Sequence, residues 1–61
     1  LSEGKDPAVK DTLARVQFHR GDLARAIELQ KAAIELADDE RMKKQLGATL
    51  AEYEAARKAN G

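Results

Sequence analysis

The fold of this chain is decided by residues 21–36, which read GDLARAIELQKAAIEL. Gly21 can adopt the left-handed backbone conformation that often ends a helix, and Asp22 can accept hydrogen bonds from the free amides of the helix that follows. Ala26 and Ala33 then place small side chains on one face, two helical turns apart, where a neighbouring helix could approach closely. The stretch therefore predicts the turn and the second helix of an antiparallel helical hairpin.

Helix signals also occur on both sides of this stretch. Asp6 and Pro7 are a capping residue and a residue suited to the first helical position, and the acidic run at 38–40 favours a further helix N-terminus. We therefore expect an all-α fold, an antiparallel hairpin plus a third helix. The expected parts are a flexible N-terminus at 1–5, a single domain at 6–61, and helices at about 7–20, 23–37 and 40–59.

The apolar stripes predict which helix lies in the middle. At ~100° per residue, the apolar side chains of the second helix cover roughly half of its circumference, which requires two neighbours. The outer helices carry narrower stripes, Val9, Leu13 and Val16 on the first and Met42, Leu46, Leu50 and Tyr53 on the third. We expect the second helix to be sandwiched between the other two, with Ile27 and Ile34 among the most buried residues.

Composition narrows the range of functions. Sixty-one residues allow one small domain. Eleven basic and eleven acidic residues balance, which argues against a nucleic-acid surface or an anionic membrane surface, since both require a basic excess. No apolar run approaches the ~20 residues of a membrane span. Because the chain begins with Leu1 instead of Met, we expect it to be part of a longer protein or a product trimmed at its start.

The residue types needed for catalysis are not grouped in this sequence. The one histidine, His19, has no cysteine and no clustered carboxylates near it, and no serine lies beside it to form a nucleophile–base pair. The glycines form no phosphate-binding loop. We therefore expect no enzymatic activity, no cofactor and no metal.

The hairpin resembles a tetratricopeptide repeat, a helix–turn–helix unit of ~34 residues. The resemblance rests on the turn and on the positions of small residues, which are Leu13-Ala14 at the family's Leu-Gly pair, Gly21-Asp22-Leu23 at its turn, Ala26 and Ala33 in its second helix, and Leu46-Gly47 at a second Leu-Gly pair. Such a repeat implies close helix packing, which would also explain a glycine at position 47 within a helix.

Several positions depart from the family pattern. Lys10, Gln17 and Gln30 stand where large apolar residues are usual, and Asp38 replaces the closing proline. No further Gly-Asp turn follows Tyr53, so the third helix resembles the helix that caps such arrays. The chain then holds about one and a half divergent or terminal repeats, fewer than the ~three that usually make a stable stack.

The resemblance implies a non-catalytic protein–protein interaction module that holds a partner protein or peptide in a groove between first helices. The residues expected to line the groove are Asp11, Arg15, Phe18, Gln45, Thr49 and Glu52. Phe18 has two interpretations, an exposed contact residue beside Arg15 or a side chain folded over the turn onto Leu23. Three i, i+4 pairs, Asp11/Arg15, Glu40/Lys44 and Glu54/Lys58, are expected to stabilise the helices weakly.

The alternative function is structural, a three-helix element that associates with itself and has no peptide groove. Without a preceding repeat, Val9, Val16 and Phe18 would be left with too little to cover them, and exposed apolar surface of this kind usually marks an interface. This interpretation predicts a homodimer that uses the first helix on both sides.

Overall fold

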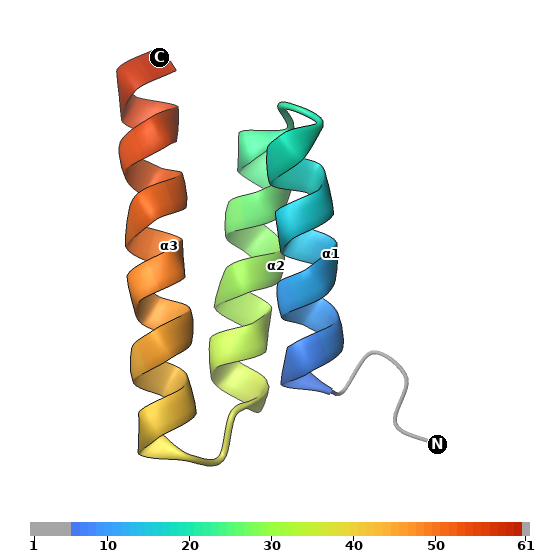
Figure 1. Ribbon diagram of the computed structural model, residues 1–61, viewed down its shortest axis with the longest axis vertical. Coiled ribbons are helices and arrows are strands. Elements are labelled where there is room, and N and C mark those ends of the chain that lie inside the picture. The colour runs from blue at the N-terminus through green and yellow to red at the C-terminus, as the bar shows by residue number, and fades with distance from the viewer. Residues whose placement is uncertain (1–5, 61) are drawn as a thin grey trace.

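The computed structural model describes residues 6–60, which form three α-helices (Figure 1). They are α1 (Pro7–His19), α2 (Leu23–Leu36) and α3 (Glu40–Asn60). Each helix begins at the residue predicted for it and ends within one residue of the prediction. The expected flexible segment 1–5 and the last residue, 61, lie outside the described residues.

Aspartate side chains cap the start of all three helices. Asp6 Oδ1 accepts a hydrogen bond from the Ala8 amide at 2.9 Å, and Asp22 Oδ1 accepts from the Arg25 amide at 3.1 Å. Asp39 Oδ1 does the same for the Arg41 amide at 2.9 Å. These contacts satisfy amide donors that have no partner inside the helix.

The turn between α1 and α2 depends on Gly21. Its φ of +88° lies in the left-handed region, as predicted. The Gly21 amide donates to the Phe18 carbonyl at 3.0 Å and the Asp22 amide donates to the Gln17 carbonyl at 2.9 Å. This is the hydrogen-bond pattern with which a glycine closes the C-terminus of a helix.

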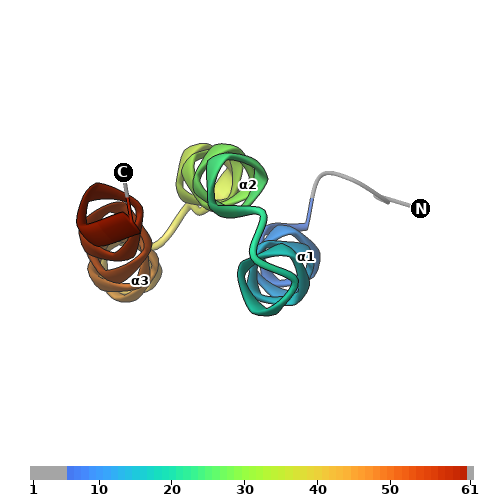
Figure 2. The same ribbon diagram turned by 90° about the horizontal axis from the view of Figure 1, so that it is seen from above.

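Helix α2 lies between α1 and α3, as its broad apolar face predicted. Both outer helices pack on α2, and both lie on the same side of it, so that α2 forms the apex of a shallow V (Figure 2). Two clusters of buried side chains fill the V. The first holds Ala14, Ala26, Ile27 and Tyr53, with Phe18, Leu29 and Leu50 packed against it, and the second holds Ala33, Ala37 and Leu46, with Ile34 packed against it.

The prediction for Ile34 is wrong in degree. Ile27 is 4% exposed, as expected, whereas Ile34 is only half-buried. Ile27 belongs to the same cluster as the Tyr53 ring, while Ile34 belongs to the second cluster, where alanines and Leu46 provide less covering area. The two isoleucines therefore differ in burial although both lie on the apolar half of α2.

The face that α1 presents to α2 differs from the predicted stripe. Ala14 is fully buried and Phe18 is half-buried, whereas Val9, Leu13 and Val16 are 42%, 42% and 45% exposed. Alanine at position 14 allows α1 to approach α2, and the same rotation of α1 brings the Phe18 ring, the largest apolar group of the helix, into the core. Val9 and Val16 are thus exposed, as we expected, whereas Phe18 is half-buried.

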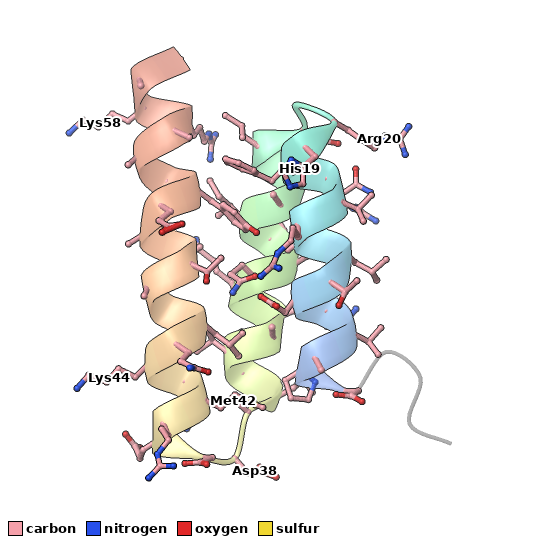
Figure 3. All side chains as sticks on the ribbon, in the orientation of Figure 1. His19, Arg20, Asp38, Met42, Lys44 and Lys58 are labelled. Atoms are coloured by element: carbon pink, nitrogen blue, oxygen red, sulfur yellow. The ribbon has the colours of Figure 1, made fainter. Side chains whose placement is uncertain are left out.

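Close helix packing does not explain Gly47. A Cβ atom placed there would meet no other atom within 4 Å, apart from its own helix backbone and chain neighbours. The expectation that a neighbouring helix requires glycine at this position is therefore wrong. Met42, at the start of the α3 stripe, is 37% exposed and adds little to the core (Figure 3).

A candidate partner-binding groove

A shallow groove runs between α1 and α3 on the side of the V that faces away from α2. It encloses about 370 Å³, and its lining comes from one turn of α1 and one turn of α3. The lining residues are Asp11, Arg15, Gln45, Leu46, Ala48 and Thr49. Four of the residues expected to line a groove are therefore brought together, although the two helices that carry them are separated in sequence by the whole of α2.

The α1 wall carries one acid and one base. Arg15 Nη2 lies 3.7 Å from Asp11 Oδ2, and the two side chains are 62% and 24% exposed. An exposed pair of this kind contributes about 0.2–1 kcal/mol at most, so it holds neither side chain firmly. The Arg15 guanidinium keeps most of its donors available to solvent or to a partner. The other two predicted pairs, Glu40/Lys44 and Glu54/Lys58, do not come within ion-pair distance.

The α3 wall is uncharged, and its polar side chains are Gln45 and Thr49. Gln45 is exposed, and Thr49 is half-buried with its Oγ1 donating to the Gln45 carbonyl at 3.4 Å. The Thr49 oxygen can still accept a hydrogen bond, and the Gln45 amide can both donate and accept. The two walls together offer a carboxylate, a guanidinium, an amide and a hydroxyl within one cavity.

Phe18 and Glu52 do not line this cavity. Phe18 stacks on Tyr53 with ring centroids 4.6 Å apart and an angle of 22° between the ring planes, and it meets His19 edge-on at 6.0 Å. Its ring partner in the core is thus Tyr53, and the Phe18 side chain remains half-buried. The stacked pair follows Arg15 and Thr49 along their helices and lies outside the groove lining. Glu52 is exposed on α3, outside the lining.

Gln30 joins α2 to the α3 wall, although from the sequence it was expected only as a departure from the pattern of tetratricopeptide repeats. Its side chain is fully buried, and Nε2 donates to the Leu46 carbonyl at 3.0 Å. Its Oε1 is buried and has no hydrogen-bond partner among the described residues. Helical periodicity could have indicated that Gln30 is buried, because position 30 falls among the apolar positions of α2.

Residues 6–60 also bear on two other kinds of feature, a metal site and a membrane-spanning helix. Within that range, no group of three or more histidine, cysteine, aspartate or glutamate side chains is arranged to hold a metal ion. None of the three described helices combines the length and the apolar character needed to cross a membrane.

Comparison with known proteins gives no relative. No protein-family model, no curated protein and no solved structure matches this chain.

Proposed function

We propose that this chain is a non-catalytic protein–protein interaction module that holds an extended peptide segment of a partner protein in the groove between α1 and α3. The observation that carries the proposal is that Asp11 and Arg15 of α1 share one cavity with Gln45 and Thr49 of α3. The resemblance to a tetratricopeptide repeat supports it, because members of that family often bind partners along the face formed by their first helices.

The chemistry of the groove favours a polar peptide over an apolar one. An extended peptide carries unpaired backbone amides and carbonyls, which the groove can match with a carboxylate, a hydroxyl and an amide. Arg15 is the more exposed member of its ion pair, so a carboxylate or carbonyl of the peptide can reach its guanidinium. The surrounding apolar contacts are small, from Ala48 and Leu46, and leave room for a peptide backbone.

Selection from a displayed library of random peptides, followed by titration calorimetry with the selected peptides, tests this proposal. Arg15→Ala should weaken binding by about 10-fold or more and Thr49→Ala by about 2- to 10-fold, because a hydrogen bond to a charged group contributes about 1.5–3 kcal/mol and a neutral one about 0.5–1.5 kcal/mol. Arg25→Ala is the matched control, since Arg25 is exposed on α2 and lies outside the groove. A library that yields no binder, or binders indifferent to both groove variants, would contradict the proposal.

The second candidate is a structural element that associates with itself. The observation that favours it is the exposed apolar stripe on α1, which lies on the opposite side of that helix from Asp11 and Arg15. The two functions use different surfaces and do not compete.

A further inference from the structure

The outer face of α1 carries an apolar stripe that no other described part of the chain covers. Val9, Leu13 and Val16 are 42%, 42% and 45% exposed, and α2 and α3 both lie on the other side of the helix (Figure 2). They are three of the four large apolar residues among positions 6–60 with this degree of exposure, and the fourth, Met42, is on α3. An uncovered stripe along one helix is the kind of surface that another helix can occupy.

The stripe extends in both directions with the spacing of a helix–helix seam. Asp6 precedes Val9 by three residues and Arg20 follows Val16 by four, so the five positions alternate at intervals of three and four. This alternation keeps Val9, Leu13 and Val16 on one face of the helix, as in a coiled-coil seam, and Asp6 and Arg20 flank that face as the capping residues at the two ends of α1. The seam therefore has an apolar centre and one charge at each end.

The two terminal charges are opposite and symmetrically placed. Asp6 and Arg20 each lie seven residues from Leu13, and both are exposed. Among residues 6–60 neither forms an ion pair, although Asp6 Oδ1 caps the helix by accepting from Ala8. Arg20 projects outward at the turn that ends α1 (Figure 3). A helix packed on the seam with its terminal charges in the reverse order would place a positive charge beside Asp6 and a negative charge beside Arg20.

We propose that the occupant is a second copy of this chain, with the two α1 helices antiparallel around a two-fold axis at Leu13. In this arrangement Leu13 faces its own copy, Val9 faces Val16 of the other chain, and each Asp6 faces an Arg20. A parallel pair would instead set the two aspartates together and the two arginines together, and like charges disfavour that orientation. The helix dipoles also favour the antiparallel order.

The proposed dimer is weak because its interface is small. Stable protein–protein interfaces use about 20–30 residues a side, and this seam offers five. The dimer therefore forms at high concentration or between chains already held close to each other. It goes beyond the proposed peptide groove, because it uses the opposite face of α1 and leaves Arg15 and Thr49 accessible.

Sedimentation equilibrium of the whole chain from roughly 10 μM to 2 mM tests the association, since mass action makes a weak dimer concentration-dependent. The apparent mass should rise toward that of a dimer. Leu13→Glu should remain monomeric over the same range with unchanged helical circular dichroism, because position 13 is exposed in the single chain. Met42→Glu, an equivalent change of an exposed apolar residue on α3, should leave the dimer intact.

Cysteine cross-linking tests the geometry, since the chain contains no cysteine of its own. Leu13→Cys should form a disulfide dimer under mild oxidation at least 10-fold faster than Ala51→Cys, an exposed position on α3. In an equal mixture of Val9→Cys and Val16→Cys chains of different mass, the mixed disulfide should exceed both same-residue disulfides.

Three outcomes would overturn the proposal. A strict monomer up to 2 mM would mean that two copies of the chain do not pair through the seam. A dimer that survives Leu13→Glu would place the interface elsewhere. Predominant same-residue disulfides at Val9 and Val16 would mean that the helices pair in parallel. None of these results bears on peptide binding in the groove, which the Arg15 and Thr49 variants report separately.

Discussion

The ring of Phe18 on α1 stacks on the ring of Tyr53 on α3, with centroids 4.6 Å apart and the ring planes at 22°. These are the only two aromatic residues other than histidine in the chain. The pair joins the first helix to the last, which otherwise pack mainly on α2. Tyr53 belongs to the larger of the two core clusters and Phe18 packs against it, so the stack contributes to the stability of the fold.

Loss of this contact should destabilise the whole domain. Because Phe18 is half-buried, Phe18→Ala should lower the free energy of unfolding by about 2–3 kcal/mol, somewhat less than the ~3–5 kcal/mol of a fully buried phenylalanine. Thermal unfolding followed by circular dichroism at 222 nm measures the effect. Tyr53→Phe keeps the ring and is the control, with an expected change within about 0.5 kcal/mol. Equal melting curves for Phe18→Ala and the unaltered chain would mean that the stack contributes nothing.

The two isoleucines of α2 should differ in their contribution to stability. Ile27→Ala should cost about 2–5 kcal/mol, and Ile34→Ala should cost clearly less, since Ile34 is only half-buried and loses fewer contacts. Urea unfolding of both variants gives the comparison directly. The reverse order would show that the second cluster, around Ala33, Ala37 and Leu46, is the dominant core.

Gln30 should be replaceable by an apolar residue of similar size. Gln30→Leu removes one hydrogen bond to Leu46 and also removes a buried oxygen that has no partner, whose desolvation costs about 1–3 kcal/mol. We expect Gln30→Leu to be neutral or to stabilise the domain by up to about 2 kcal/mol in a urea titration. Gln30→Ala, which removes the hydrogen bond and leaves a cavity, should destabilise it. A loss of more than about 1 kcal/mol in Gln30→Leu would show that the hydrogen bond to Leu46 outweighs the unpaired oxygen.

Gly21, in the turn between α1 and α2, and Gly47, within α3, should respond oppositely to substitution. Gly21 has φ +88°, where a β-branched residue is strained, so Gly21→Val should destabilise by about 1–3 kcal/mol. Gly47 is helical and a methyl group there meets no other atom within 4 Å, so Gly47→Ala should stabilise by about 0.5–1 kcal/mol through helix propensity. Thermal melts of both variants test the pair. A stabilising Gly21→Val would contradict the assigned turn.

The helices and their order in space could be predicted because their causes are local. The helix caps and the left-handed turn residue act on neighbours in sequence, so they can be recognised before any tertiary contact is known. They are Asp6, Asp22 and Gly21. The middle position of α2 followed from the same kind of information, since a helix that is apolar over half its circumference needs two neighbours.

The face of α1 that packs on the core could not be predicted from such local signals. The helix has two apolar faces, one with Val9, Leu13 and Val16 and the other with Ala14 and Phe18. Counting large apolar residues favours the first face, but the structure buries the second, because Ala14 permits close approach and Tyr53 offers Phe18 a ring to stack on. Neither advantage exists until α1 and α3 are placed beside α2.

The residues expected in the candidate site also fall into two groups, those that the structure brings together and those that it does not. The meeting of Asp11 and Arg15 with Gln45 and Thr49 was expected from the family resemblance, and the structure places all four around one cavity. Phe18 and Glu52 were expected there too, and the packing of α1 and α3 moves them elsewhere. The sequence by itself determined where helices start, turn and end, since hydrogen bonds between near neighbours decide that. Only the tertiary structure decided which face of α1 meets the core and which remains exposed, because that choice depends on the shape of side chains contributed by another helix.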